Sequence, residues 1–431
     1  MITTRISCRA VCNALTIAVA SVFSFVAFAN DVAIIGATVY NGSDDAPVAA
    51  TVLITGGRIT SIAPDIEIPD GYSVIETQGG SITPGLFNAA TTLGIEEIEL
   101  IAETVDTFTT DPRITASLRV ADAYNFRSPA ISLNRAQGVT HALTLPVSGS
   151  SLIAGQAALV DLSGASRSVI DPFAALVVNL GEQGQLLAGG SRAAAMQQLR
   201  EAFEDARDFI EHQSEFNRRQ RRDYALSRAD LAALAQVITD QKPLIVNVSR
   251  AADILAVIAF AQSESLNLVL WNAEEAWVVA DAIAAAKVPV MIDPIRNLPT
   301  RYETLAARAD NALLLEQAGV RLIFTGKDGS RTHRAYLMRQ SAGNAVGEGF
   351  SKSAAIEAMT SLPAMLFADG RFSNRIEVGA TANLVVWSGD PLELTSEPLA
   401  VIINGENTSL TSRSDLLAER YLERIRASAG N

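Results

Sequence analysis

Polar side chains that could do chemistry follow several apolar runs in the middle and later parts of the chain. The acids among them are Glu182 and Asp328, and the amides are Asn247 and Asn272. A pair of carboxylates can transfer protons or hold a divalent cation, whereas amides bind a substrate through hydrogen bonds. A hydrolytic zinc site needs about three ligands from His, Cys or carboxylate groups, with one position open for water. Two acids do not meet that number, and Asn oxygens suit Ca²⁺ better than Zn²⁺. The residues themselves therefore predict a polar pocket for which no cofactor is expected.

Two roles are assigned within this pocket. Glu182 and Asp328 are the candidate catalytic residues. The candidate substrate-binding residues are Asn247, Arg250, Asn272 and His333. An alternative for Asp328 is a buried structural acid that pairs with Lys327, Arg331 or Arg250.

The chain has three histidines, which are too few to rebuild a histidine-rich metal site. His141 lies within an apolar run and is expected to fill the core, and His212 lies in a charged helical stretch. His333 follows Asp328 closely enough to reach the rim of the predicted pocket. We therefore expect at most one histidine near the site.

These residues are positioned by a series of apolar runs that have the composition of buried β-strands. Helical stretches separate the later runs, and such alternation is typical of a parallel sheet that helices cover on its faces. With the run that begins near Leu86 there are about eight strands, the number that closes a TIM-type (β/α)8 barrel. A doubly wound open sheet is the alternative, although no Gly-x-Gly-x-x-Gly follows the first strand. The other runs are 138–145, 158–162, 175–180, 243–248, 266–271, 288–292 and 320–324.

The two ends of the chain share a different pattern. Short β-branched runs separated by Gly, Asn and Asp fill residues 32–81, and residues 376–407 have the same character. Neither end is long enough to form a domain alone, so we expect one small β-sandwich built from both. The predicted boundaries are 30–83 and 376–407 for the sandwich, 84–375 for the barrel and 408–431 for a helical tail.

The first 29 residues are typical of a secretory signal peptide. Two arginines precede an uncharged, apolar stretch that ends in Ala27-Phe28-Ala29, which matches the order of regions in such peptides. An uncleaved membrane anchor is the alternative, because about 20 uncharged residues can just span a bilayer. Cys8 and Cys12 both lie in this segment, so cleavage leaves no thiol for a disulfide or a metal. We expect a periplasmic protein of a Gram-negative bacterium, with no stable membrane insertion after cleavage.

The charge of the chain limits its partners. Its net charge is −13, and 48% of its residues are hydrophobic. A strongly acidic chain is poorly suited to nucleic acid or to anionic lipid, which both attract basic surfaces. The apolar content is ample for a large core, so a small molecule is the expected ligand.

Several stretches, in their order along the chain, resemble motifs of one enzyme superfamily. The part of the chain from about Asp31 to about Glu406 is similar to the amidohydrolase superfamily, in particular its imidazolonepropionase-like group. The motifs that carry the resemblance are Thr83-Pro84-Gly85-Leu86, Gly138-Val139-Thr140, the glycine-rich segment 149–156, Arg250-Ala251-Ala252-Asp253 and the segment 377–384.

The resemblance implies hydrolysis of C–N bonds by a metal-bound hydroxide, with an acid after the last strand moving the proton. That acid corresponds to Asp328, and Glu182 falls where a bridging acid or lysine is often found. The histidine ligands of the family correspond to other residues here. Their positions are taken by Ala90 and Thr92 after the first strand, by Asn247 or Ser249 after the fifth and by Asn272 after the sixth.

Three functions are compatible with these observations. The first is a metal-poor, catalytically impaired homologue that acts as a binding or partner subunit, with an active amidohydrolase paralogue as its partner. The second is an active hydrolase with a reduced site of Glu182 and Asp328, for which a divalent metal such as Zn²⁺ would be the cofactor. The third is a periplasmic binding protein for a small amide or peptide-like ligand.

Overall fold

The computed structural model of the chain describes residues 31–43, 45–296, 298–326 and 331–429. The predicted signal peptide, residues 1–29, and the candidate acid Asp328 lie outside the described residues. Within the part that is described, no helix combines the length and the apolar character that a membrane span requires.

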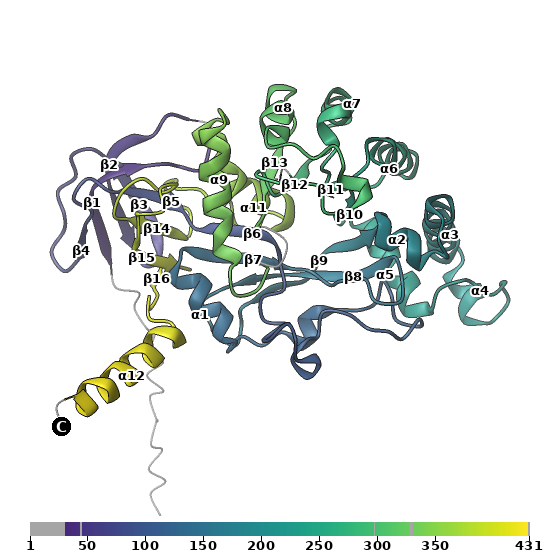
Figure 1. Cartoon of the computed structure of the whole chain (residues 1–431), viewed down its shortest axis with the longest axis horizontal. Helices are drawn as coiled ribbons and strands as arrows, with labels where there is room; N and C mark the ends of the chain where they lie inside the picture. The colour runs from purple at the N-terminus through teal and green to yellow at the C-terminus, as the bar shows by residue number, and fades with distance from the viewer. Residues whose placement is uncertain (1–30, 44, 297, 327–330, 430–431) are drawn as a thin grey trace, which may run out of the picture.

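One of the two eight-stranded sheets is a nearly closed barrel. Its strands follow one another in space in the order of the sequence, and the last of them, β13, lies against the first, β6 (Figure 1). The alternation of strand and helix predicted from the sequence is thereby confirmed. The barrel strands are β6 (Leu86–Thr91), β7 (Val139–Thr144), β8 (Ile153–Asp161), β9 (Val169–Asn179), β10 (Leu244–Val248), β11 (Leu268–Asn272), β12 (Val290–Ile292) and β13 (Leu322–Phe324).

One strand of the barrel runs against the others. β8 is antiparallel to both β7 and β9, whereas the remaining neighbours in the sheet are parallel. The segments on either side of β8, 145–152 and 162–168, hold no helix, and a parallel crossover needs a dozen or more residues. The chain therefore makes two hairpins here. As a result Ile153, at the start of β8, pairs with Val178 near the end of β9.

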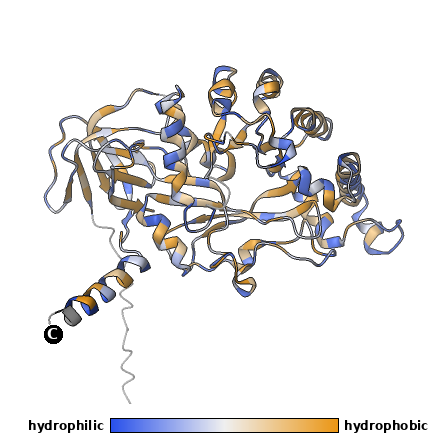
Figure 2. Ribbon diagram, in the orientation of Figure 1, coloured by the Kyte–Doolittle hydropathy of each residue, from blue (hydrophilic) through white to orange (hydrophobic). Residues whose placement is uncertain are grey.

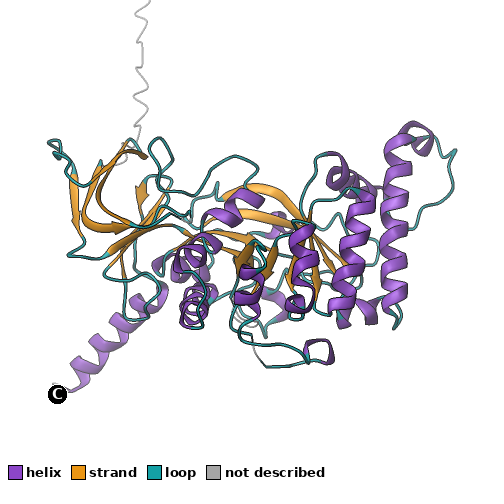
Figure 3. Cartoon of the chain, turned by 90° about the horizontal axis from the view of Figure 1, so that it is seen from above, coloured by secondary structure: helices purple, strands orange, loops and turns teal. Residues whose placement is uncertain are grey.

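Helices surround the barrel on its outside (Figure 3). Outward-facing strand residues such as Leu244 and Val246 pack with helix residues such as Phe203 and Phe260 in one buried layer. Figure 2 shows the barrel strands coloured mainly as hydrophobic. The helices are α1 (Pro129–Ala136), α2 (Glu182–Leu187), α3 (Arg192–Glu211), α4 (Gln213–Asn217), α5 (Arg228–Thr239), α6 (Ala251–Glu264), α7 (Ala280–Ala285), α8 (Asn311–Gln317), α9 (Met338–Gly347), α10 (Lys352–Ala358), α11 (Ser361–Phe367) and α12 (Arg413–Ala429). Short 3-10 helices are η1 (Ala102–Thr104), η2 (Val120–Ala123), η3 (Ala276–Val279), η4 (Tyr302–Thr304) and η5 (Ala335–Leu337).

The interior of the barrel is a second apolar cluster. Alternate strand residues point inward, so that Ile245 of β10, Val269 of β11 and Ile323 of β13 meet there. Ala90 of β6 and Trp271 of β11 belong to the same cluster. The barrel is therefore packed with apolar side chains up to the level of the indole of Trp271.

The second sheet joins the two ends of the described chain, as the sequence predicts. Its strands run in the order β16-β15-β14-β5-β1-β2-β3, with β4 beside β1. The link between the ends is the antiparallel pair of β5 and β14, in which Ile82 lies opposite Val386. The fold class is thus confirmed as an α/β barrel with a separate sheet. Its strands are β1 (Val32–Val39), β2 (Val48–Thr55), β3 (Arg58–Ala63), β4 (Ser73–Glu76), β5 (Ser81–Pro84), β14 (Leu384–Trp387), β15 (Pro398–Ile403) and β16 (Glu406–Asn407).

Candidate functional site

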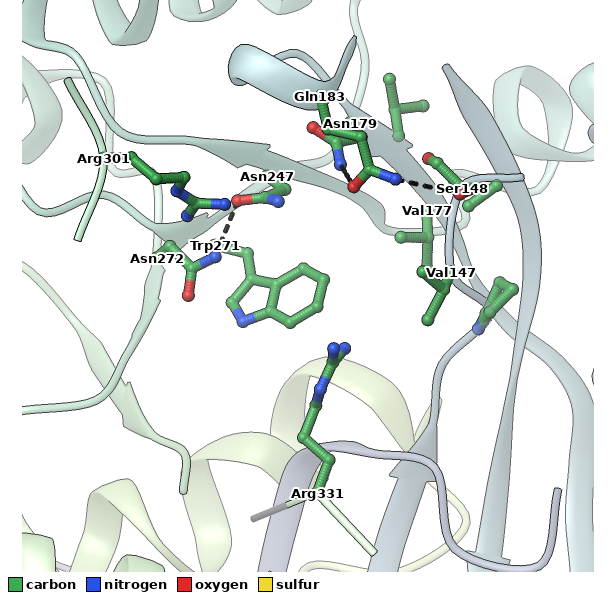
Figure 4. Close-up of a pocket in the computed structure, with 13 residues that line it drawn as sticks. Val147, Ser148, Val177, Asn179, Gln183, Asn247, Trp271, Asn272, Arg301 and Arg331 are labelled. Atoms are coloured by element: carbon green, nitrogen blue, oxygen red, sulfur yellow. Dashed lines mark hydrogen bonds between the residues drawn. The ribbon is translucent and has the colours of Figure 1, made fainter. Parts of the chain in front are cut away.

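A polar pocket lies at the edge of the barrel where β9, β10 and β11 end (Figure 4). The cavity volume is about 110 Å³, which is room for several water molecules or for a small polar group. The segment that follows β7 and the start of β8 complete its wall. The described residues that line it are Pro146, Val147, Ser148, Ala154, Val177, Val178, Asn179, Gln183, Asn247, Trp271, Asn272, Arg301 and Arg331.

Two amide side chains, predicted separately from the ends of two strands, meet in this pocket. Nδ2 of Asn272 donates a hydrogen bond of 2.7 Å to Oδ1 of Asn247. Asn272 has a φ of 70° and the next residue, Ala273, a φ of 47°. This left-handed backbone breaks the alternation of β11, so that both Trp271 and Asn272 line the pocket.

The wall formed by β9 and α2 is a chain of hydrogen bonds. Nδ2 of Asn179 donates to Oε1 of Gln183 over 3.0 Å, and Nε2 of Gln183 donates to the carbonyl of Ser148 over 3.1 Å. Oδ1 of Asn179 accepts the N–H of Gly181 over 3.2 Å. Because these two amide side chains hydrogen-bond to each other and to the backbone, they hold this wall of the pocket in place.

Two guanidinium groups enter the pocket from different loops. Arg331 follows β13, and its guanidinium carbon lies 5.6 Å from the centre of the Trp271 ring. Arg301 begins the turn that contains η4 and points toward the pair of Asn247 and Asn272 (Figure 4). No acidic side chain is among the described residues that line the pocket.

A second hollow, beside the first, contains two of the predicted site residues. Glu182 and Arg250 both line it, together with Arg192, Tyr302 and Glu303, and its cavity volume is about 390 Å³. Oε1 of Glu182 accepts the N–H of Glu303 over 2.9 Å, and Oε2 of Glu303 accepts the N–H of Glu182 over 2.7 Å. Burial raises the pKa of Glu303 above its ordinary value. These reciprocal bonds fasten α2 to η4.

The structure brings together some of the predicted residues and separates others. Asn247 and Asn272 share the first pocket, whereas Glu182 and Arg250 share the second. His333 is exposed and is not among the residues that line either hollow. Ser249, the alternative to Asn247 after the fifth strand, is buried away from the pocket lining, so it is Asn247 that faces the pocket.

Sequence reasoning did not predict Arg301, Arg331, Asn179 or Gln183 as site residues. Asn179 and Gln183 carried a signal, since they end or follow an apolar strand as Asn247 does. Arg301 lies in a long loop with no such marker. Arg331 was considered as a partner for Asp328, and its place against Trp271 depends on contacts far apart in the sequence.

The fold has clear relatives among solved structures. An amidohydrolase from Thermotoga maritima MSB8 superposes with a TM-score of 0.78 over 88% of this chain and 99% of that one, at 22% sequence identity. The chain has the fold of the amidohydrolase superfamily. The structure of molinate hydrolase is also similar to this chain, with a TM-score of 0.55, 17% identity and coverage of 88% of this chain and 95% of that one.

One curated relative is similar in sequence. It is the amidohydrolase TasK of Hapsidospora irregularis, 22% identical over 388 residues, which are 82% of this chain and 39% of that protein. The chain thus matches about two fifths of the length of this relative. No protein-family model matches the chain. The resemblance seen in the sequence motifs is confirmed at the level of the superfamily.

The resemblance places metal ligands at Ala90, Thr92, Asn247 and Asn272, and the donors found there do not fit a zinc ion. Ala90 is packed in the apolar interior, and Oγ1 of Thr92 lies 2.7 Å from Oγ1 of Thr332. The described part of the chain contains no group of three His, Cys, Asp or Glu side chains close enough to share a metal. A divalent cation in the pocket would also face two guanidinium groups, which carry the same sign of charge.

Proposed function

We propose that this chain is a binding member of the amidohydrolase superfamily, which holds a small amide or peptide-like ligand at the mouth of the barrel without metal-assisted hydrolysis. One observation carries the proposal. Where the resemblance places a metal, the structure has the apolar cluster of Ala90 and Trp271, and above it amide and guanidinium groups. Such groups bind polar ligands through hydrogen bonds and do not coordinate zinc.

The pair of asparagines is suited to an amide. Oδ1 of Asn247 and Nδ2 of Asn272 bond to each other. Among the described residues, the remaining polar atoms of the pair, Nδ2 of Asn247 and Oδ1 of Asn272, have no hydrogen-bond partner. They offer one donor and one acceptor side by side, which matches the C=O and N–H of an amide.

The hydrolytic alternative has less support from the geometry. Of its two acids, Glu182 lies in the neighbouring hollow, and one of its oxygens accepts the backbone N–H of Glu303. The proposed setting of the binding role is the periplasm, on the basis of the N-terminal segment, beside an active amidohydrolase as partner.

The proposal is tested on mature protein purified without added metal. We expect well under one equivalent of Zn, Mn or Fe by elemental analysis, shifts of the melting temperature with dipeptides or cyclic amides, and no hydrolysis of these compounds. The variant Asn247→Leu, which removes the free donor, should lose the shift. Stoichiometric metal together with turnover would contradict the proposal, and turnover that vanishes in Asp328→Asn would support the hydrolytic alternative.

A further inference from the structure

The pocket at the barrel mouth has a charge opposite to that of the chain. The chain has a net charge of −13, yet the charged groups among the described lining residues are the guanidiniums of Arg301 and Arg331. Two like charges around a cavity of about 110 Å³ repel each other, and this repulsion is weakened when an anion lies between them. The described lining of the pocket is therefore positively charged, and such a lining favours an anionic group.

Among the described residues, neither guanidinium has an ion pair within hydrogen-bond distance. The guanidinium of Arg331 lies over the face of Trp271. Nε of Arg301 lies 3.6 Å from Oε1 of Glu303, beyond hydrogen-bond distance, and this buried nitrogen has no hydrogen-bond partner among the described residues. Glu303 also forms an ion pair with Arg192, in which Oε2 of Glu303 lies 3.6 Å from Nη2 of Arg192. The terminal nitrogens of both arginines, which line the pocket, have no hydrogen-bond partner among the described residues and remain as donors for a ligand.

The backbone that carries Arg331 is fixed to the first barrel strand. The N–H of Thr92 donates to the carbonyl of Arg331 over 3.1 Å. The next residue, Thr332, is bound through its hydroxyl to Thr92 and through its carbonyl to Nδ2 of Asn134, over 2.7 and 2.8 Å. These contacts hold the backbone at Arg331 in place before any ligand binds.

The backbone that carries Arg301 is fixed in the same way. Oγ1 of Thr304 accepts the N–H of Arg301 over 3.2 Å and donates to its carbonyl over 3.0 Å. The turn is then fastened to α2 by the reciprocal bonds of Glu182 and Glu303. Charged groups that are held in place before binding lose little conformational freedom on binding, which favours affinity.

We propose that this pocket binds a carboxylate between Arg301 and Arg331, and that the ligand is an N-acyl amino acid or dipeptide whose amide lies on the pair of Asn247 and Asn272. The inference rests on the proposed binding function and adds the charged end of the ligand. Guanidinium forks match carboxylate oxygens in geometry and charge. Trp271, which also lines the pocket, gives an apolar surface beside the ligand.

The test compares matched ligands by isothermal titration calorimetry on the mature chain. Each N-acetyl amino acid is paired with its own carboxamide, which keeps the amide and the side chain but removes the charge. We expect the acid to bind at least about tenfold more tightly than the carboxamide, as for hydrogen bonds to a charged group. Arg301→Gln and Arg331→Gln should each lose about tenfold toward the acid and little toward the carboxamide.

Two further variants separate charge from geometry. Arg331→Lys keeps the charge without the fork and should lie between the wild type and Arg331→Gln. Arg334→Gln, at an exposed arginine near Arg331 that does not line the pocket, should bind as the wild type does. Melting curves of all variants establish that they are folded.

The outcomes distinguish this inference from the binding function itself. If the carboxamides bind as tightly as the acids, or if the arginine variants keep full affinity for the acids, the carboxylate assignment is wrong and the binding function stands. If inorganic phosphate binds and no N-acetyl amino acid does, the assignment is also wrong. If no member of any pair binds, both proposals fail together.

Discussion

At the scale of single residues, Asn272 combines a strained backbone with a side chain that the pocket uses. Its φ of 70° is in the left-handed region, and its Nδ2 bonds to Asn247 over 2.7 Å. Most residues lose roughly 1–2 kcal/mol in this conformation, while Asn and Gly tolerate it better. An asparagine therefore meets both demands at this position, the backbone turn and the hydrogen bond.

Two substitutions of Asn272 that both remove the amide should differ in their effect on stability. Asn272→Ala and Asn272→Gly should each abolish ligand binding by the asparagine pair. The alanine variant should have a free energy of unfolding about 1 kcal/mol lower than the glycine variant, because only alanine is strained at a positive φ. Urea denaturation of the two variants measures the difference. Equal stabilities would show that the backbone at this position is not strained.

His141 is the buried histidine that the sequence predicts to be a core residue. Its ring stacks on Phe372 with 4.5 Å between ring centres, and Nδ1 lies 2.9 Å from Oγ1 of Thr140. Burial lowers its pKa from the ordinary value of 6.5 to about 4, and the nearby charge of Asp161 offsets part of this effect. The unfolded chain therefore binds a proton at this residue more readily than the folded chain does.

The stability that neutral His141 contributes is complete above pH 6.5 and is lost as the pH falls toward 4. At pH 5 the loss should be about 2 kcal/mol, given about 1.4 kcal/mol per pKa unit. His141→Gln should lose that much less stability between pH 7.5 and pH 5 in urea denaturation. His212→Gln, at a half-exposed histidine, is the matched control and should keep the full dependence.

The residues of the pocket differ in how far the sequence could reveal them. Asn247 and Asn272 lie at the ends of the apolar strands β10 and β11, so strand order and barrel geometry were enough to bring them together. The sequence could not show that Glu182 turns away toward Glu303, because that depends on a contact between residues 121 positions apart. Arg301 is placed by the same contact. Loop side chains at a barrel mouth are positioned by tertiary contacts that no local pattern encodes.

At the scale of elements, the apolar runs predicted all of the barrel strands but not the direction of β8. Hydrophobic periodicity locates a strand but does not indicate the direction in which it runs. The signal was in the connections, since segments 145–152 and 162–168 are too short for the helical crossover that parallel strands need. The reversal has a functional consequence, because it brings Ala154, at the start of β8, to the wall of the pocket.

Helix α2 shows how closely an element is fitted against the pocket. A Cβ added to Gly184 would lie 1.9 Å from the carbonyl oxygen of Asn179. Gly184→Ala should therefore displace the start of α2, lower the free energy of unfolding by about 2 kcal/mol or more and weaken ligand binding. Gly347→Ala, at a helical glycine in α9 with no atom within 4 Å of its added Cβ, is the control. It should be neutral or slightly stabilising in the same denaturation experiment. Equal effects of the two substitutions would contradict the fit seen at Gly184.

At the scale of the whole molecule, the second sheet ties the two ends of the described chain to the entrance of the barrel. β5 pairs with β14 and then continues, after Gly85, into β6. Nε1 of the fully buried Trp387 donates to Oγ1 of Thr83 over 2.9 Å. The first barrel strand is therefore anchored on a sheet that closes only when the C-terminal strands have joined it. This dependence explains why the two ends share one pattern in the sequence.

Helix α12, by contrast, extends away from the rest of the chain (Figure 1). Its apolar residues Leu416, Tyr421, Leu422 and Ile425 are about half exposed or more, from 49% to 62%. Such a helix contributes little to the core, so its removal should cost little stability. Deletion of residues 413–431 is expected to change the melting temperature by less than about 2 °C and to leave ligand binding intact, since a surface change usually stays within about 0.5 kcal/mol.

The matched deletion starts earlier, at residue 398, and also removes β15 and β16. It exposes the edge of β14 and takes away the buried residues Ala400, Val401, Ile402 and Ile403. This chain should fail to fold, because the strand that anchors β5 loses its neighbour on the other side. Circular dichroism and calorimetric titration of both deletions measure fold and binding together. A large loss of stability in the shorter deletion would mean that the exposed face of α12 packs against another surface in solution.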